Sequence, residues 1–321
     1  MCGAPGMAAL RHSVFHLERY QEPMRGNAFI TVRRYMILVT GGTGFVGSHI
    51  VSRLTSGGEK VRVLARSWVD MPRADMVQGD VRDLSAVVQA ARGCNAVIHL
   101  VGIIRETGDQ TFRRVHVDGT RTVIQACHEA GVPRLLHMSA LGARPAARSE
   151  YHRTKWEAEE LVRGSRFPAT IFRPSVIFGP GEGFIAEVRK LLRQGSVIPI
   201  IGGGTSLLQP VWVEDVASCF VSALRESQTS GQAYELGGPE AFGFEELVDL
   251  VAEADGVAKP KIHFSPKLIG PAAAVLGRVW RRFPITSDQL RMLLEDSVCD
   301  ITAMVQTFGI EPASLRDHLN D

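Results

Sequence analysis

Several features are scarce in this 321-residue sequence, and each scarcity excludes a class of protein. The five cysteines include no Cys-x-x-Cys pair, so neither a disulfide framework nor a zinc site is expected, and a reducing compartment fits. The ten histidines form no ligand motif, and we predict no bound metal. No run of 18 apolar residues occurs, which excludes an ordinary membrane-spanning helix.

An excess of one charge is also lacking, because 36 basic and 34 acidic residues leave a net charge of only +2. A broad nucleic-acid-binding surface is therefore not expected. Lysine itself is rare, with six residues in the whole chain, so a lysine in a motif is less expected by chance. The 45% of apolar residues is enough for a sizeable core, in one large or two modest domains.

Residues 1–35 differ in composition from the rest of the chain. They contain five arginines against two glutamates and no long apolar stretch, which excludes a secretory signal. We predict that this extension is disordered or comes from an upstream, wrongly assigned start codon, with an Arg-rich transit peptide as the alternative. We expect the folded body to begin near Met36. The expected location is the cytoplasm.

The first clear motif is a glycine loop between a strand and a helix. The apolar run 36–40 meets the glycines at 41, 44 and 47, apolar residues then recur at helical spacing, and 60–65 reads as a second strand. Glycines at this junction permit a tight turn and close approach to a pyrophosphate, which the helix N-terminus attracts. We therefore predict a dinucleotide site at Gly41, Gly44, Phe45, Val46 and Gly47.

Arg66, at the end of the second predicted strand, indicates which dinucleotide binds. NAD sites generally place an acidic residue there to accept the ribose 2′-hydroxyl, whereas a guanidinium can pair with a 2′-phosphate. We expect NADP(H), with NAD(H) as the alternative. An ordinary solvent-facing arginine would also explain this residue in such an Arg-rich chain.

Further apolar runs continue the alternation of strands and helices. This pattern predicts an α/β fold, a doubly wound parallel Rossmann sheet with a smaller C-terminal α/β lobe. Because ligands bind at the carboxyl ends of such strands, we add seven positions to the cofactor site: Asp80, Val81, Val101, Gly102, Pro174, Tyr151 and Lys155. His99 and His137 stand inside apolar runs and are expected to be core residues.

A Ser, Tyr and Lys set follows the fifth predicted strand. Ser139 ends that strand, and Tyr151 and Lys155 are spaced i and i+4, which places them on one face of a helix. A nearby ammonium can lower the pKa of a phenol and can bind ribose hydroxyls. We predict Tyr151 as the acid or base, Lys155 as its partner and Ser139 as the orienter of a substrate carbonyl. An exposed amphipathic helix is the structural alternative.

Together these residues resemble the extended short-chain dehydrogenases/reductases of the atypical kind. The resemblance covers about residues 36–321 and rests on TGGTGFVG at 40–47, Gly79-Asp80, HVDGT at 116–120, HMSA at 137–140, YxxxK at 151–155, RPSVIFGP at 173–180 and QPVWVEDVA at 209–217. Where extended members commonly have Asn, this sequence has His116. The tail segments 284–296 and 308–312 are similar to the family of complex I subunit nine, whose members include a relative in coenzyme Q synthesis.

The resemblance implies bound NADP(H), with Tyr151 and Lys155 as contacts, in a Rossmann domain over 36–240. A small lobe comprises 176–207 and 241–321. Segment 268–283, apolar and then Arg-rich, suggests peripheral contact with the inner membrane, or else a core helix with a basic end.

Three functions remain open from the sequence. The first is hydride transfer between NADP(H) and a carbonyl, hydroxyl or quinone compound. The second is a non-catalytic accessory or assembly role in respiratory complex I or a quinone-synthesis complex. The third is a nucleotide-sugar epimerase or dehydratase, which Arg66 disfavours because those enzymes typically hold NAD.

Overall fold

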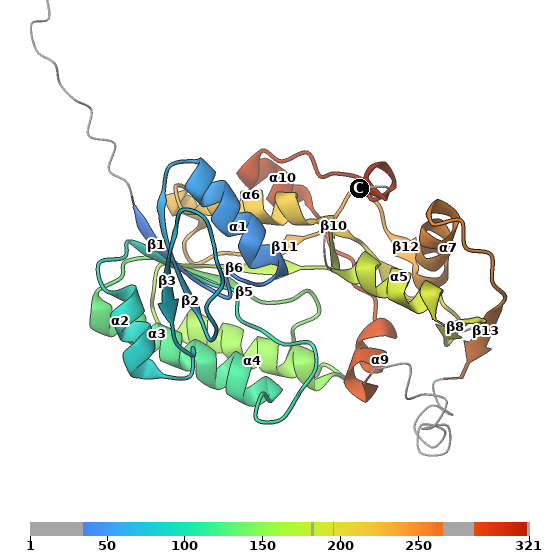
Figure 1. Ribbon diagram of the computed structural model, residues 1–321, viewed down its shortest axis with the longest axis horizontal. Coiled ribbons are helices and arrows are strands. Elements are labelled where there is room, and N and C mark those ends of the chain that lie inside the picture. The colour runs from blue at the N-terminus through green and yellow to red at the C-terminus, as the bar shows by residue number, and fades with distance from the viewer. Residues whose placement is uncertain (1–34, 181–182, 195, 266–285, 320–321) are drawn as a thin grey trace, which may run out of the picture. The chain divides into compact units, whose positions relative to one another are not determined.

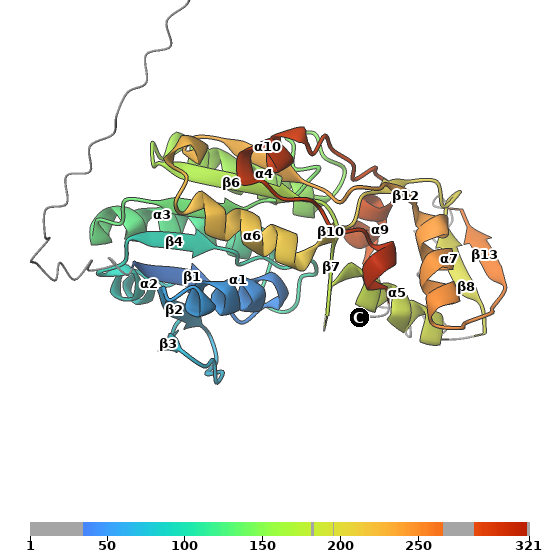
Figure 2. The same ribbon diagram turned by 90° about the horizontal axis from the view of Figure 1, so that it is seen from above.

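A central sheet of seven strands, parallel at every pairing, organises the chain (Figures 1 and 2). The computed structural model describes residues 35–180, 183–194, 196–265 and 286–319. The sheet order is β11-β6-β5-β4-β1-β2-β3, which confirms the predicted doubly wound Rossmann fold. Its strands are β1 (Met36–Thr40), β2 (Lys60–Ala65), β3 (Ala74–Gln78), β4 (Ala96–His99), β5 (Leu135–Met138), β6 (Ala169–Pro174) and β11 (Ala233–Leu236).

Helices cover both faces of this sheet (Figure 1). One face carries α1 (Phe45–Ser56) and α6 (Val213–Ala223), and the other carries α2 (Leu84–Ala91), α3 (Gly119–Ala130) and α4 (Glu150–Gly164). The inner strands are therefore buried on both sides, and Leu38, Val39 and Val97 are fully inaccessible. This double burial explains why the strands read as continuous apolar runs rather than as alternating patterns.

The smaller lobe is built around its own apolar core. Its helices are α5 (Phe184–Arg193) and α7 (Phe244–Ala254), and Leu192, Ile200 and Leu247 are fully buried between its elements. Short strand pairs complete it: β7 (Ile177–Phe178) with β10 (Val211–Trp212), β8 (Ile198–Ile201) with β13 (Lys261–Phe264), and β9 (Leu207–Leu208) with β12 (Phe242–Gly243). The last helices are α9 (Ser287–Leu293) and α10 (Thr302–Phe308), the latter packed on α6 and β11.

The helix that follows β4 is not regular throughout, and two segments singled out in the sequence lie outside the described residues. The helix that follows Phe112 begins with a π-helical segment, Arg113–Asp118, before α3 continues it. Such segments are rare and often accompany functional sites. Residues 1–34 of the predicted extension and the whole of the segment 268–283 lie outside the described residues. Among the described helices, none has the length and apolarity to cross a bilayer.

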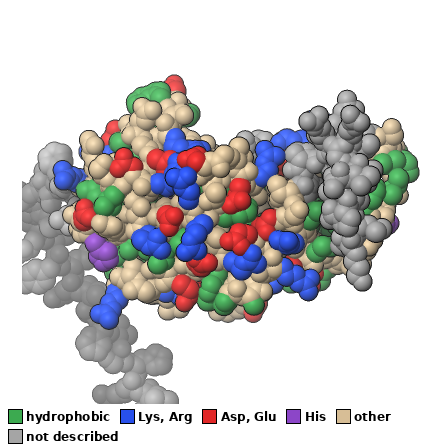
Figure 3. Space-filling view, turned by 90° about the horizontal axis from the view of Figure 1, so that it is seen from below, with side chains coloured by type: hydrophobic (Ala, Val, Ile, Leu, Met, Phe, Trp, Pro, Cys, Tyr) green, Lys and Arg blue, Asp and Glu red, His purple; other side chains and the backbone are tan. Residues whose placement is uncertain are grey.

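The face formed by α2, α3 and α4 carries basic and acidic side chains interspersed rather than segregated (Figure 3). Ion pairs join neighbours there, including Arg113 with Glu157 and Arg121 with Asp118. Such exposed pairs are each worth at most about 1 kcal/mol, so this face is solvated surface rather than a source of stability.

Candidate active site

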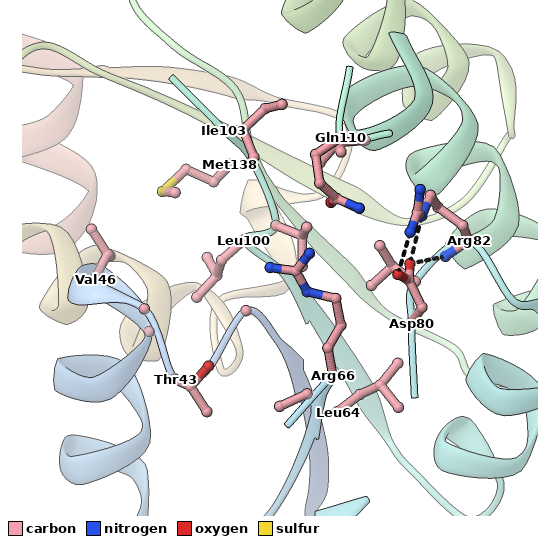
Figure 4. A pocket seen from close by; sticks show the side chains of 18 of the residues that line it. Thr43, Val46, Leu64, Arg66, Asp80, Arg82, Leu100, Ile103, Gln110 and Met138 are labelled. Atoms are coloured by element: carbon pink, nitrogen blue, oxygen red, sulfur yellow. Dashed lines mark hydrogen bonds and ion pairs between the residues drawn. The ribbon is translucent and has the colours of Figure 1, made fainter. Parts of the chain in front are cut away.

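A cavity of about 350 Å³ opens where β1, β2 and β4 end (Figure 4). It lies at the point where the strand order reverses, between β1 and β4, which is where open α/β sheets bind ligands. Ten residues predicted for the cofactor line it: Gly41, Gly44, Phe45, Val46, Gly47, Arg66, Asp80, Val81, Val101 and Gly102.

The glycine loop has a geometry that side chains would destroy. Gly41 has a positive φ of 78°, and its carbonyl accepts a hydrogen bond from the Gly44 amide at 3.1 Å. A Cβ atom at residue 47 would lie 2.1 Å from the Gly41 carbonyl oxygen, so only glycine lets α1 begin this close to β1. No side chain caps α1, and its first amides remain available for phosphate oxygens. The loop therefore fits a dinucleotide.

Two arginines border the part of the cavity beyond β2. Figure 4 shows the Arg66 side chain reaching across the cavity toward Leu100. Arg82 pairs with Asp80 at 2.8 Å and with Asp109 at 2.9 Å. Hydrogen bonds from Arg82 hold the pKa of Asp80 below its ordinary value. Asp80 is thus neutralised locally, which leaves the Arg66 guanidinium as a cation facing the cavity.

Tyr151 and Lys155 lie one turn apart on α4, as the spacing predicts. Lys155 is buried, and its Nζ donates to the Met138 carbonyl at 2.9 Å. A Cβ atom at Gly102 would lie 3.0 Å from that Nζ, so the ammonium lies against the cavity wall. Met138 itself lines the cavity, whereas Tyr151 and Lys155 are not among its lining residues.

The pKa values of this pair differ from the expectation that Lys155 lowers the pKa of Tyr151. Burial raises the pKa of Tyr151 to about 12. Burial also lowers the pKa of Lys155 to about 8. Loss of hydration penalises the charged form of each group, and this effect exceeds the attraction between them. The phenol is therefore protonated at neutral pH.

His116 connects the loop after β4 to the helix α4. Its Nδ1 lies 2.9 Å from the Thr154 hydroxyl, which itself donates to a carbonyl of the preceding turn of α4, and its Nε2 accepts from the Ile103 amide at 3.1 Å. Burial and then Lys155 lower its pKa well below the usual range, so the ring is neutral. Its ring also packs edge-on against Tyr151, with 5.5 Å between centroids. His116 thus fixes the loop after β4 to the Tyr-Lys helix.

Ser139 and Pro174 do not line the cavity. The Ser139 hydroxyl is buried and has no hydrogen-bond partner among the described residues. Glu159, on α4, is fully buried, and although burial raises its pKa, hydrogen bonds from Arg173 and Arg163 hold it below the ordinary value. Pro174 accepts a backbone hydrogen bond from Leu141.

The cavity also contains residues that the sequence reasoning missed: Thr43, Leu64, Ala65, Gly79, Arg82, Leu100, Ile103, Gln110, Val115 and Met138. Arg82 could have been found, since it stands two residues after Asp80. Thr43 and Gly79 stand in motifs that carry the family resemblance, whereas the remaining residues carry no individual sequence signal. His99 and His137 are buried, as predicted for core residues, with ring centroids 5.4 Å apart. Within the described ranges, no group of three or more His, Cys, Asp or Glu could hold a metal ion.

The sheet order, the glycine loop and the cavity at the switch point define a Rossmann dinucleotide-binding protein. Residues 37–237 match the NAD dependent epimerase/dehydratase family, and the chain belongs to that family. Its cofactor is accordingly a nicotinamide dinucleotide, and the chain is a relative of extended short-chain dehydrogenases/reductases.

Two individual proteins and one solved structure show which members of the family this chain resembles. The chain is 30% identical over 303 residues to NADH dehydrogenase [ubiquinone] 1 alpha subcomplex subunit 9, mitochondrial, of Arabidopsis thaliana, covering 87% of this chain and 75% of that protein. It is 33% identical over 201 residues to the ceramide reductase of Caulobacter vibrioides, covering 61% and 62% of the two. The structure of DesIV (dTDP-glucose 4,6-dehydratase) from Streptomyces venezuelae, with NAD and TYD bound, superimposes with a TM-score of 0.72 over 89% of this chain and 94% of that one. At 22% identity, this likeness shows the shared fold alone.

Proposed function

We propose that this protein binds NADP(H) and reduces a carbonyl compound, with Tyr151 as the proton donor. The observation that carries the proposal is the Arg66 guanidinium in the cavity, at the position where NAD sites generally place an acid. A relative named as a reductase, over 61% of this chain, supports the same chemistry.

The residues that would hold the cofactor surround the cavity. The free amides at the start of α1 would bind the pyrophosphate, and Arg66 would pair with the 2′-phosphate. Lys155, with a pKa of about 8, is mostly protonated at pH 7 and would donate to nicotinamide ribose hydroxyls. When bound, the reduced nicotinamide supplies the hydride.

The protonation state of Tyr151 fits the role of a proton donor. Its pKa of about 12 keeps the phenol protonated, so it can donate a proton to a carbonyl oxygen that gains negative charge. The donation would leave a phenolate, which would regain a proton from solvent before the next reduction. The role predicted for Ser139, which is to orient the substrate carbonyl, stays a prediction, and its buried hydroxyl has no hydrogen-bond partner among the described residues.

A second candidate is an accessory or assembly role in respiratory complex I or a quinone-synthesis complex, with the protein peripheral at the inner membrane. It is favoured by the similarity to subunit 9, which extends over 87% of this chain. In this case the cofactor would stabilise the fold and Tyr151 would not transfer protons.

The test begins with the nucleotide that copurifies with the full-length protein. NADPH oxidation is then measured with carbonyl compounds and quinones for wild type, Tyr151→Phe and Tyr35→Phe. Tyr35 is an exposed tyrosine at the start of β1 and provides the matched control.

Under the proposal, wild type and Tyr35→Phe oxidise NADPH, and Tyr151→Phe loses roughly 100-fold or more of the rate. If wild type binds NADPH firmly yet oxidises it with no carbonyl compound or quinone, the reductase proposal fails and the accessory role is favoured. A preference for NAD over NADP would overturn the assignment of Arg66 and favour a nucleotide-sugar enzyme.

A further inference from the structure

A segment from the C-terminal part of the chain contacts the start of the Tyr-Lys helix. This segment, residues 286–300, is called the strap below; it contains α9, which lies beside the beginning of α4 (Figure 1). The carboxylate of Asp288 accepts hydrogen bonds from the backbone amides of Glu150 at 2.7 Å and Tyr151 at 3.0 Å. The partners are 138 and 137 residues apart in sequence.

These hydrogen bonds complete the N-terminus of α4. A helix begins with four amides that have no partner within it. Ser149 accepts from the His152 amide through its side chain and from the Arg153 amide through its carbonyl, and Asp288 serves the first two. Asp288 also lies in the first turn of α9, so two helix N-termini face one carboxylate that is only 13% exposed. Both helix dipoles favour its negative charge there.

The strap is held at two further places. Glu295, 10% exposed, pairs with Arg144 at 2.6 Å in the loop that leads to α4. On its other side, the Asp296 carboxylate accepts from the Leu207 amide at 2.9 Å, and the Ser297 carbonyl accepts from the Gln209 amide at 3.0 Å. The strap therefore joins the small lobe to the helix that carries Tyr151.

We propose that Asp288 is a positioning residue for Tyr151. Its carboxylate fixes the backbone at Glu150 and Tyr151 and thereby the place of the Tyr151 ring among Phe112, His116 and His152, which pack against it edge-on. The catalytic consequence rests on the proposed function. Asp288 does not touch the reacting atoms and acts only through α4.

Two measurements test this with Asp288→Asn, and Asp300→Asn serves as the matched control. Asp300 makes the same kind of backbone hydrogen bond at the start of α10, to the Thr302 amide. The first measurement is NMR of ring-labelled tyrosine, with the Tyr151 signal assigned from Tyr151→Phe. The second compares kcat, KM and the NADPH Kd. A purely structural role would lower the thermal midpoint without separating kcat from KM.

In Asp288→Asn we expect the Tyr151 ring signal to shift while that of Tyr234, buried in the core under α6, stays in place. We also expect kcat to fall roughly 10- to 100-fold, as for a misplaced catalytic group, at unchanged KM and NADPH Kd. Asp300→Asn should resemble wild type in both measurements. An unmoved Tyr151 signal, or a wild-type kcat in Asp288→Asn, would overturn the proposal. If wild type itself oxidises no NADPH, the proposed function fails separately, and the ring signal alone decides whether Asp288 positions Tyr151.

Discussion

Replacing Gly47 by alanine should damage the cofactor site more than its small size suggests. The new Cβ would lie 2.1 Å from the Gly41 carbonyl oxygen and 2.7 Å from the Gly42 Cα, and both of these are backbone atoms. Since ordinary contacts to carbon need more than 3 Å, α1 would have to move from the loop by roughly 1 Å. Such overpacking costs about 1–3 kcal/mol, against which alanine regains up to about 1 kcal/mol of helix propensity.

The expected net result for Gly47→Ala is a thermal midpoint lower by roughly 2–8 °C. The NADPH Kd should rise by at least roughly tenfold, because the amides that face the phosphates move with α1. Circular dichroism melting and NADPH fluorescence titration measure the two effects. Gly164→Ala is the control, since a Cβ there meets nothing within 4 Å. A Gly47→Ala protein with the wild-type Kd would refute the argument that this close approach shapes the site.

Four further predictions follow from the same structure. Arg66→Ala should raise the NADPH Kd roughly 10- to 100-fold and leave the NADH Kd nearly unchanged in fluorescence titrations, because one charge-assisted contact is worth about 1.5–3 kcal/mol. Burial holds the pKa of Lys155 at about 8 in the folded state, so between pH 8 and 10.5 the unfolded chain binds a proton that the folded chain does not. Over this range the unfolding free energy of wild type, measured in urea, should therefore rise by about 3 kcal/mol relative to that of Lys155→Met. A constant difference between the two proteins would contradict this. Glu159→Gln should lower the unfolding free energy at pH 7 by roughly 3 kcal/mol, because Arg173 loses a buried partner. Ser139→Ala should lower the rate of NADPH oxidation by at least roughly tenfold, because the substrate carbonyl loses an orienting hydrogen bond, and a wild-type rate would contradict the predicted orienting role of Ser139.

Much of the site could be predicted because its signals are local. Gly41, Gly44 and Gly47 are required by one turn between one strand and one helix, and the position of Arg66 follows from the next strand end. Tyr151 and Lys155 share a helix, so their spacing alone places them on one face. Most of the lining residues missed, such as Leu100 and Met138, are ordinary apolar residues whose place at the cavity depends on strand order.

Hydrophobic period, glycine spacing and helical spacing act over a few residues, and they were enough to predict the parallel sheet, the dinucleotide loop and the Tyr-Lys pair. The chemical state of that pair depends on the packing of the whole chain, since burial depends on segments distant in sequence. That packing raised the pKa of Tyr151 to about 12, where the sequence favoured a lowered value. It buried the Ser139 hydroxyl without a hydrogen-bond partner among the described residues and brought Asp288 to the first turn of α4 from 137 residues away. No local pattern encodes contacts of that length, because they arise when separately specified elements pack together.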